Sequence, residues 1–181
     1  EKDYLISVYP NLLNQLNAPM LMMCGLNSDG VLGDNSTTNR SSPVQTVAFG
    51  SNWKQSSLGT SHSASIKADG TLWMWGLNNS GNLGDSTYYV NRSSPVQTIA
   101  GGTNWKQVSC GVSQAAAVKT DGSLWVWGYN PDGRLGTNST VHYSSPTTTS
   151  GGGTTWESVF GGWYHLTAIK TDGSLWTCGY N

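Results

Sequence analysis

Short apolar segments that end in glycine recur along the chain and are separated by long polar stretches. Leu72-Trp73-Met74-Trp75-Gly76 returns as Leu124-Trp125-Val126-Trp127-Gly128, with weaker copies at 21–25 and 175–179. Residues on both alternating sides of these segments are apolar, which predicts strands that are buried on both faces. Asp69-Gly70 stands just before the first full copy, and Asp-Gly is typical of tight hairpin turns. Each apolar strand is therefore expected to pair antiparallel with the strand before it.

The apolar segments belong to a longer repeat of nearly constant length. They begin at residues 21, 72, 124 and 175, at intervals of 51, 52 and 51 residues. In each interval the apolar strand is followed by Asn, Gly-x-Leu-Gly, Ser-Ser-Pro, a lone Trp and a glycine six residues after that Trp. An interval of about 40 to 50 residues with about four short strands has the size of one β-propeller blade. The pattern thus predicts an all-β protein, a β-propeller of four-stranded antiparallel blades, with about three blades present.

The repeat also predicts how the chain is organised. The expected units are the propeller repeats at 21–71, 72–123 and 124–174, with the start of a fourth at 175–181. Residues 1–20 do not match the repeat and are expected to form a linker or adaptor, or else a strand that closes the ring. A closed propeller needs about four blades or more. We therefore expect either further blades in a longer chain or a homo-oligomer that completes the ring.

These motifs resemble the regulator of chromosome condensation repeats. The resemblance covers residues 21–181 and rests on LWxWGxN, Gly-x-Leu-Gly, Ser-Pro-Val, the Trp with a glycine six residues later, and the AxKxDGxLW hairpin. It implies a larger ring of the seven-bladed type. The founding member of the family exchanges nucleotide on a small GTPase through an inserted wedge and has a basic tail, and this sequence has neither. A plant photoreceptor of the family uses Gly-Trp-Arg-His-Thr motifs, which only Gly162-Trp163-Tyr164-His165 approaches, so photoreception is not expected.

Composition and motifs narrow the classes of function. Nine basic residues are spread along the chain and are matched by ten acidic ones, so no nucleic acid partner is expected. No apolar stretch is long enough for a membrane span. Three distant cysteines, interpreted as small buried apolar residues, and the scattered Asp residues predict no metal site. No nucleophile, phosphate loop or carboxylate pair is apparent, His62 and His165 occupy equivalent positions suited to structural hydrogen bonds, and neither catalysis nor a cofactor is expected.

Candidate binding residues lie where the copies of the repeat differ. Eight of the nine tryptophans recur at equivalent positions and are predicted to pack in the core, whereas Trp163 replaces Thr60 and Val112. The loops at 35–40, 86–92 and 138–143 also vary, and loops on a rigid scaffold often carry binding sites. Tyr, Trp and Arg are favoured at interfaces. The predicted binding rim, contacting a protein or a glycan, consists of Tyr88, Tyr89, Arg92, His142, Tyr143, Trp163 and Tyr164.

The sequence therefore predicts a non-enzymatic binding or structural module. The near-identical tandem copies resemble bacterial and bacteriophage members of the family, which predicts an attachment or interaction platform in a virion or on a cell surface. One alternative is a eukaryotic-type scaffold or GTPase exchange-factor propeller with a cytoplasmic location. Another is a secreted inhibitor of an enzyme.

Overall fold

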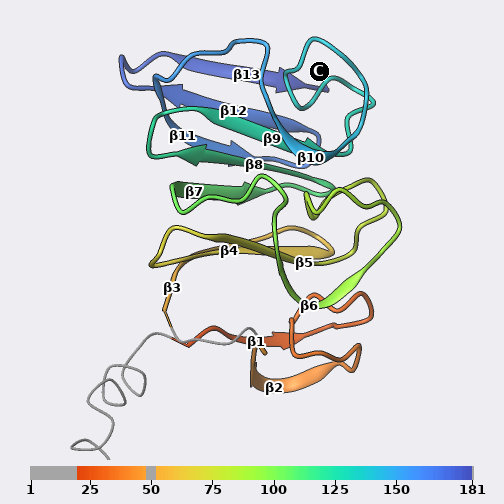
Figure 1. Cartoon of the computed structure of the whole chain (residues 1–181). Coiled ribbons are helices and arrows are strands. Elements are labelled where there is room, and N and C mark those ends of the chain that lie inside the picture. The colour runs from red at the N-terminus through yellow and green to blue at the C-terminus, as the bar shows by residue number, and fades with distance from the viewer. Residues whose placement is uncertain (1–19, 48–51, 181) are drawn as a thin grey trace, which may run out of the picture.

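The structure, a computed structural model, describes residues 20–47 and 52–180 (Figure 1). These residues form thirteen strands, and no helix occurs among them. The prediction of a linker or closing strand at residues 1–20 lies outside the described residues, apart from Met20.

The strands form four antiparallel sheets, which we call blades I to IV. Blade I contains β1 (Met22–Gly25) and β2 (Arg40–Gln45), and blade IV contains β11 (Trp156–Gly161), β12 (His165–Lys170) and β13 (Leu175–Gly179). Between them lie two four-stranded sheets. Blade II is formed by β3 (Trp53–Leu58), β4 (His62–Lys67), β5 (Leu72–Gly76) and β6 (Arg92–Gln97). Blade III is formed by β7 (Trp105–Cys110), β8 (Gln114–Lys119), β9 (Leu124–Gly128) and β10 (Tyr143–Thr148).

The blades stack face to face in chain order, as Figure 1 shows from blade I near the bottom to blade IV at the top. Each sheet is a simple meander whose strands pair with their sequence neighbours. The Asp-Gly turns work as expected, since Gly70 has a φ of +80° and Ile66 on β4 faces Leu72 on β5. Blades II, III and IV each begin at the lone Trp, so the interval 72–123 supplies two strands to blade II and two to blade III. The all-β prediction with four-stranded antiparallel blades is confirmed.

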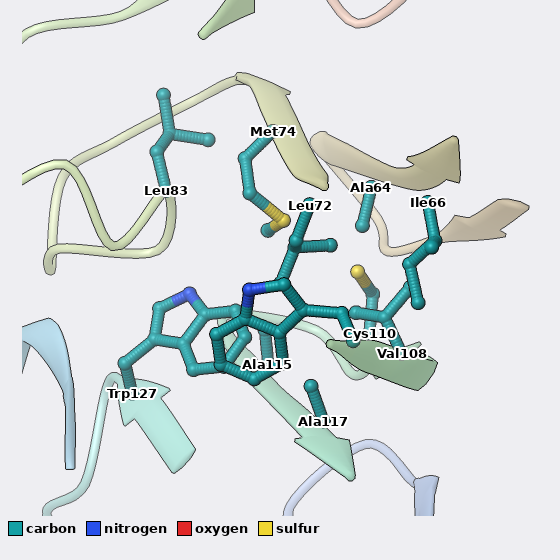
Figure 2. Packing of buried hydrophobic residues seen from close by; sticks show 11 residues of the cluster. Ala64, Ile66, Leu72, Met74, Leu83, Val108, Cys110, Ala115, Ala117 and Trp127 are labelled. Atoms are coloured by element: carbon teal, nitrogen blue, oxygen red, sulfur yellow. The ribbon is translucent and has the colours of Figure 1, made fainter. Parts of the chain in front are cut away.

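Apolar side chains fill the space between blades II and III, because each sheet presents small and large residues in complementary positions. Figure 2 shows Leu72 and Met74 of blade II pointing toward blade III, which supplies Ala115 and Trp127, and Leu83 belongs to the same core cluster. These side chains are all fully buried. A single fully buried side chain of this size contributes roughly 1.5–3 kcal/mol through removal from water. Burial between sheets thus explains why the apolar strands have no polar side.

Paired hydrogen bonds join the first strands of blades II, III and IV, which are β3, β7 and β11. The amide of Gln55 donates to the carbonyl of Val108 at 2.7 Å and accepts from the Val108 N–H at 2.9 Å. Gln107 makes the same pair of bonds to Val159 in the next blade, at 3.0 and 2.9 Å. The hydroxyl groups of Ser57 and Ser109 each accept a backbone N–H from the following blade at 2.9 Å. These bonds satisfy strand backbone that has no partner in its own sheet.

A buried asparagine organises each loop that follows an apolar strand. Asn78 is fully buried, accepts the N–H of Leu83 at 3.1 Å and donates to Asp85 at 3.1 Å. Asp85 also accepts from Thr87 and from Arg92. Burial raises the pKa of the Asp85 carboxyl, but these hydrogen bonds outweigh it and hold that pKa below its ordinary value. The Asn of the repeat motif is therefore a structural residue. Asn27 makes the same two bonds, to Leu32 and Asp34, and Asn130 makes them to Leu135 and to Thr137, which replaces the aspartate.

The packing role predicted for the repeated tryptophans holds in blades II and III. Trp53 and Trp105 are buried, and each contacts the ammonium group of a lysine on the neighbouring strand. In blade IV, Trp176 is half exposed, although it lies on the side of β13 that faces blade III. Leu175 on the opposite side of β13 is also exposed, because no sheet packs there within the described chain. The interpretation of all three cysteines as buried is wrong for Cys24, which is exposed on the two-stranded blade I.

Candidate binding surface

The long variable loops lie along the same side of the stack as the short turns that follow β3, β7 and β11, the first strands of blades II to IV. His62 at the start of β4 pairs with Gly76 at the end of β5, and Gly76 pairs in turn with Arg92 at the start of β6. The turn before His62 and the loop between β5 and β6 must therefore lie side by side. We call this side the loop face; it comprises residues 59–61, 77–91, 111–113, 129–142, 162–164 and 180. In Figure 1 it lies toward the right, where the C-terminal end is marked.

Most of the exposed aromatic side chains of the described residues are on the loop face. Tyr89 and Trp163 are 80% and 74% exposed, and Tyr88, Tyr164 and Tyr180 are also exposed. Such a concentration of exposed rings on one side of a domain is typical of an interaction site, because burying them in a complex removes a large apolar area from water.

Contacts across blades II and III connect the first group of these rings. The hydroxyl of Tyr88 donates to the carbonyl of His142 at 3.0 Å, although the two residues are 54 positions apart. Nδ1 of His142 accepts the backbone N–H of Asn130, which holds the imidazole in place. The imidazole lies against the ring of Tyr129, with centroids 4.7 Å apart. Tyr88, Tyr89 and His142 also line a shallow pocket with Asn79 and Val141.

A buried arginine connects this group to the aromatic residues of blade IV. The guanidinium of Arg134 lies between the rings of Tyr129 and Tyr164, at 5.0 and 4.9 Å from their centroids. Arg134 is 2% exposed and forms an ion pair with Asp132. Tyr164 makes edge contacts with Trp163 and Tyr180. We call the continuous set Tyr88, Tyr89, Tyr129, Arg134, His142, Trp163, Tyr164 and Tyr180 the aromatic strip.

The structure places the seven predicted rim residues in two environments. Tyr88, Tyr89, His142, Trp163 and Tyr164 are all members of the aromatic strip. The other two have structural partners. The guanidinium of Arg92 forms an ion pair with Asp85 at 3.0 Å, as Arg40 does with Asp34 in the blade I loop. Tyr143 starts β10 and packs partly against the apolar core.

Three members of the strip were missed by sequence reasoning. Tyr129 and Tyr180 stand where blades I and II have Leu26 and Leu77, and Arg134 stands where they have Val31 and Asn82. These three residues are substitutions within otherwise constant motifs, and that variation is the sequence signal that indicates them. The predicted rim was drawn only from the variable loops and from the segment around Trp163. That these substitutions meet in space depends on the register between blades, which the sequence does not display.

The described part of the chain shows no arrangement that indicates metal chemistry. Residues 20–47 and 52–180 contain no group of three or more His, Cys, Asp or Glu side chains placed to hold a metal ion. Burial lowers the pKa of His62 to about 4, and this histidine lies fully buried beside Gly59 and Gly111. The imidazole is therefore neutral at pH 7 and has a structural position between two blades. No helix among these residues is long and apolar enough to cross a membrane.

Comparison with known sequences agrees with the repeat seen in the fold. The profile of the regulator of chromosome condensation (RCC1) repeat matches residues 69–118 and 121–169. A second RCC1 repeat profile matches residues 53–82 and 105–134. The ultraviolet-B receptor UVR8 of Arabidopsis thaliana is 31% identical over 155 residues, which are 84% of this chain and 35% of the receptor. The human probable E3 ubiquitin-protein ligase HERC3 is 32% identical over 94 residues, 51% of this chain and 9% of HERC3.

Solved structures show the same fold at low sequence identity. Human WBSCR16 superposes with a TM-score of 0.79 at 22% identity, covering 91% of this chain and 44% of that protein. Yeast RCC1 (Prp20), solved with Kap60, superposes with a TM-score of 0.73 at 18% identity, covering 90% and 40%. The chain thus spans about a third of UVR8 and less than half of these two solved propellers. From its repeated motifs, its stacked four-stranded blades and these matches, the chain belongs to the regulator of chromosome condensation (RCC1) repeat family of β-propellers.

Proposed function

We propose that this chain is a non-catalytic part of a propeller that binds a protein partner through the aromatic strip on the loop face. The observation that carries the proposal is the continuity of the strip across blades II, III and IV. Tyr, Trp and Arg are the residues that dominate binding energy at protein interfaces. No lysine is part of the strip, and lysine is depleted at such interfaces.

The strip is also held in a defined conformation before any partner arrives. Arg134 fixes the rings of Tyr129 and Tyr164 from between, and the Tyr88 hydroxyl is tied to the next blade. Rings that are already positioned lose less conformational freedom on binding, which favours affinity. Tyr89 has a φ of +62°, an unfavourable backbone conformation for a tyrosine, and its ring is the most exposed of the strip. Strained residues of this kind are concentrated at functional sites.

The partner class and the site of action are inferred from the relatives and from the sequence. Two solved neighbours are structures of yeast RCC1 (Prp20), one with Kap60 bound and one described with its binding properties to Gsp1p and histones, so a propeller of this fold engages proteins. A glycan is the other partner class that the sequence predicts. Attachment from a virion or cell surface, a cytoplasmic scaffold and a secreted inhibitor stay predictions. The identity of the partner distinguishes these three.

The test begins with peptides selected from a displayed library on the immobilised chain, with affinities measured by fluorescence anisotropy. Replacing Trp163 or Tyr89 by alanine should weaken binding at least tenfold, or about 1.4 kcal/mol. Ile99→Ala is the matched control, because Ile99 is an exposed apolar residue in the connection after β6, on the side of the stack opposite the loop face. It should leave the affinity within about twofold.

Two results of this test would change the proposal. Peptides that bind the Trp163→Ala and Tyr89→Ala variants as tightly as the parent would contradict the strip as the binding surface. Alternatively, the chain selects no peptide but binds members of a glycan array, and the same variants lose that binding. The aromatic strip would then remain the binding surface, and its partner would be a glycan.

A further inference from the structure

One buried position of the repeat changes from tryptophan to cysteine between blades III and IV. The second Trp of the apolar strand is Trp75 in blade II and Trp127 in blade III, and both indoles are fully buried. Each reaches into the preceding blade, where its ring N–H donates to a loop carbonyl: Trp75 to Val31 at 2.7 Å and Trp127 to Asn82 at 2.9 Å. The equivalent residue in blade IV is Cys178.

The backbone frame around Cys178 is the same as around the two tryptophans. Gly33, Gly84 and Gly136 are equivalent, with φ values of +67°, +62° and +62°. A Cβ atom added at each would lie 2.9 to 3.0 Å from the side chain in question, the indole nitrogen in the first two and the Cys178 sulfur in the third. The acceptor is kept as well, since the Cys178 thiol donates to the Arg134 carbonyl at 3.3 Å. Only the aromatic ring is missing.

A pocket of about 220 Å³ lies beside Cys178. Its walls include Leu124 and Leu135 of blade III and Trp156, Val159 and Leu166 of blade IV. Gly151, another wall residue, stands where Ala100 packs on the core between blades II and III. The pocket is therefore the space that an indole and a methyl group fill in the preceding interface. Apolar cavities of about 150 Å³ are known to take up benzene.

The pocket is uncharged and keeps one directional polar group. None of its lining residues carries a charge, and burial raises the pKa of the Cys178 thiol, which stays protonated at neutral pH. The Arg134 carbonyl accepts only a weak bond from sulfur. In the preceding interface the Trp127 ring meets Trp105 edge-on, with centroids 6.4 Å apart, and Trp156 is the equivalent of Trp105. A ligand in the pocket finds the same aromatic neighbour and the same acceptor.

We propose that the pocket between blades III and IV binds a small, neutral, planar aromatic molecule with a ring N–H, of the indole class. The ring lies against Trp156, and the N–H donates to the Arg134 carbonyl in place of the thiol. This site is separate from the exposed rings of the loop face, so it stands or falls independently of the proposed protein partner.

The first experiment uses the unmodified chain with indole as the probe. Cys178 is partly accessible and Cys24 is exposed, so both thiols can be alkylated and quantified by mass spectrometry. Saturating indole should slow the alkylation of Cys178 at least tenfold and leave Cys24, in blade I, unchanged. Equal rates at Cys178 with and without indole, or equal slowing of both cysteines, would overturn the proposal.

Matched variants then test the origin of the pocket. Cys178→Trp fills the space with the residue of blades II and III and should abolish the heat of indole binding in calorimetry. Cys178→Ser keeps the space and should retain binding. Trp127→Cys should create a second indole site between blades II and III, where both sheets have four strands. Binding by Cys178→Trp at the parent's affinity would contradict the assignment. If that variant does not fold, loss of indole protection in Leu135→Phe serves the same purpose.

Discussion

The interface between blades II and III and the interface between blades III and IV are built from the same repeat, and they differ in a few side chains. Both have the paired glutamine bonds and the serine hydroxyl that accepts a backbone N–H. The II/III interface is closed by the buried indole of Trp127, whereas the III/IV interface has Cys178 and a pocket. Arg134, whose carbonyl accepts from the Cys178 thiol, has its guanidinium between two tyrosines. The shared contacts hold the blades together. The departures from the repeat at the III/IV interface form the pocket and part of the aromatic strip, which continues across the II/III interface to Tyr88 and Tyr89.

The largest expected difference between the two interfaces is the loss of stability when Trp127 or its equivalent, Cys178, is replaced by alanine. Trp127→Ala deletes a fully buried indole and its hydrogen bond to Asn82, and should lower the free energy of unfolding by about 3–5 kcal/mol. Cys178→Ala removes a small, partly exposed side chain and should cost about 1 kcal/mol or less. Urea denaturation followed by circular dichroism measures both. Equal losses would show that the III/IV interface is as tightly closed as the II/III interface.

The next difference is the response to pH. His62 at the II/III interface has its pKa lowered from 6.5 to about 4 by burial, whereas the equivalent residue at the III/IV interface is Gln114, which donates to the Gly162 carbonyl. The unfolded chain therefore binds a proton at His62 between pH 6.5 and about 4 that the folded chain does not. The contribution of His62 is fully present above pH 6.5 and is lost as the pH falls to about 4, by roughly 3 kcal/mol.

His62→Gln is the control for this pH dependence, because glutamine already occupies the equivalent position in blade III. Stability of the variant measured at intervals from pH 7 to about 4 should fall less than that of the parent across this window. Carboxylates such as Asp34 and Asp85, whose pKa values lie below the ordinary value of 3.8, lose their contributions only at lower pH. Identical pH profiles for parent and variant would rule out the buried neutral histidine.

The smallest expected difference is between the stability costs of removing Gln55 and Gln107, because the two side chains make the same pair of hydrogen bonds. Gln55→Ala and Gln107→Ala each leave a backbone N–H and a carbonyl of the next blade without their partner. Each should cost about 1–3 kcal/mol, and the two costs should agree within about 0.5 kcal/mol. Urea denaturation of the two variants makes the comparison. A much smaller cost for Gln107 would mean that the III/IV interface is held together differently from the II/III interface.

Much of the fold could be predicted from the sequence because the same strand and turn motifs occur in three successive repeats. The Asp-Gly turns, the two-sided apolar strands and the interval length led to antiparallel four-stranded blades, which the structure has. A periodic sequence does not show where one sheet ends and the next begins. The structure resolves this, since the Trp53 strand starts blade II and the Leu72 strand is its third.

The candidate sites could be predicted only in part. Trp163 and Tyr164 stood out because they replace small residues, and they are exposed on the loop face. Arg134 was passed over because its neighbours Tyr129 and Tyr164 come from two blades, and only the three-dimensional register brings them together. The Trp to Cys change at Cys178 is visible in the sequence, but the pocket depends on the neighbouring side chains not closing the space.

The most direct test of the central claim, that departures from the repeat carry the binding, restores the repeat in blade IV. The triple variant Trp163→Thr, Tyr164→Ser and Cys178→Trp takes its first two residues from Thr60 and Ser61 of blade II and its third from Trp127 of blade III. The measurement is its affinity for the selected peptides and for indole, with its melting temperature as the control for folding. We predict a folded variant, at least as stable as the parent, with both affinities reduced at least tenfold. A folded variant that keeps both affinities would contradict the account.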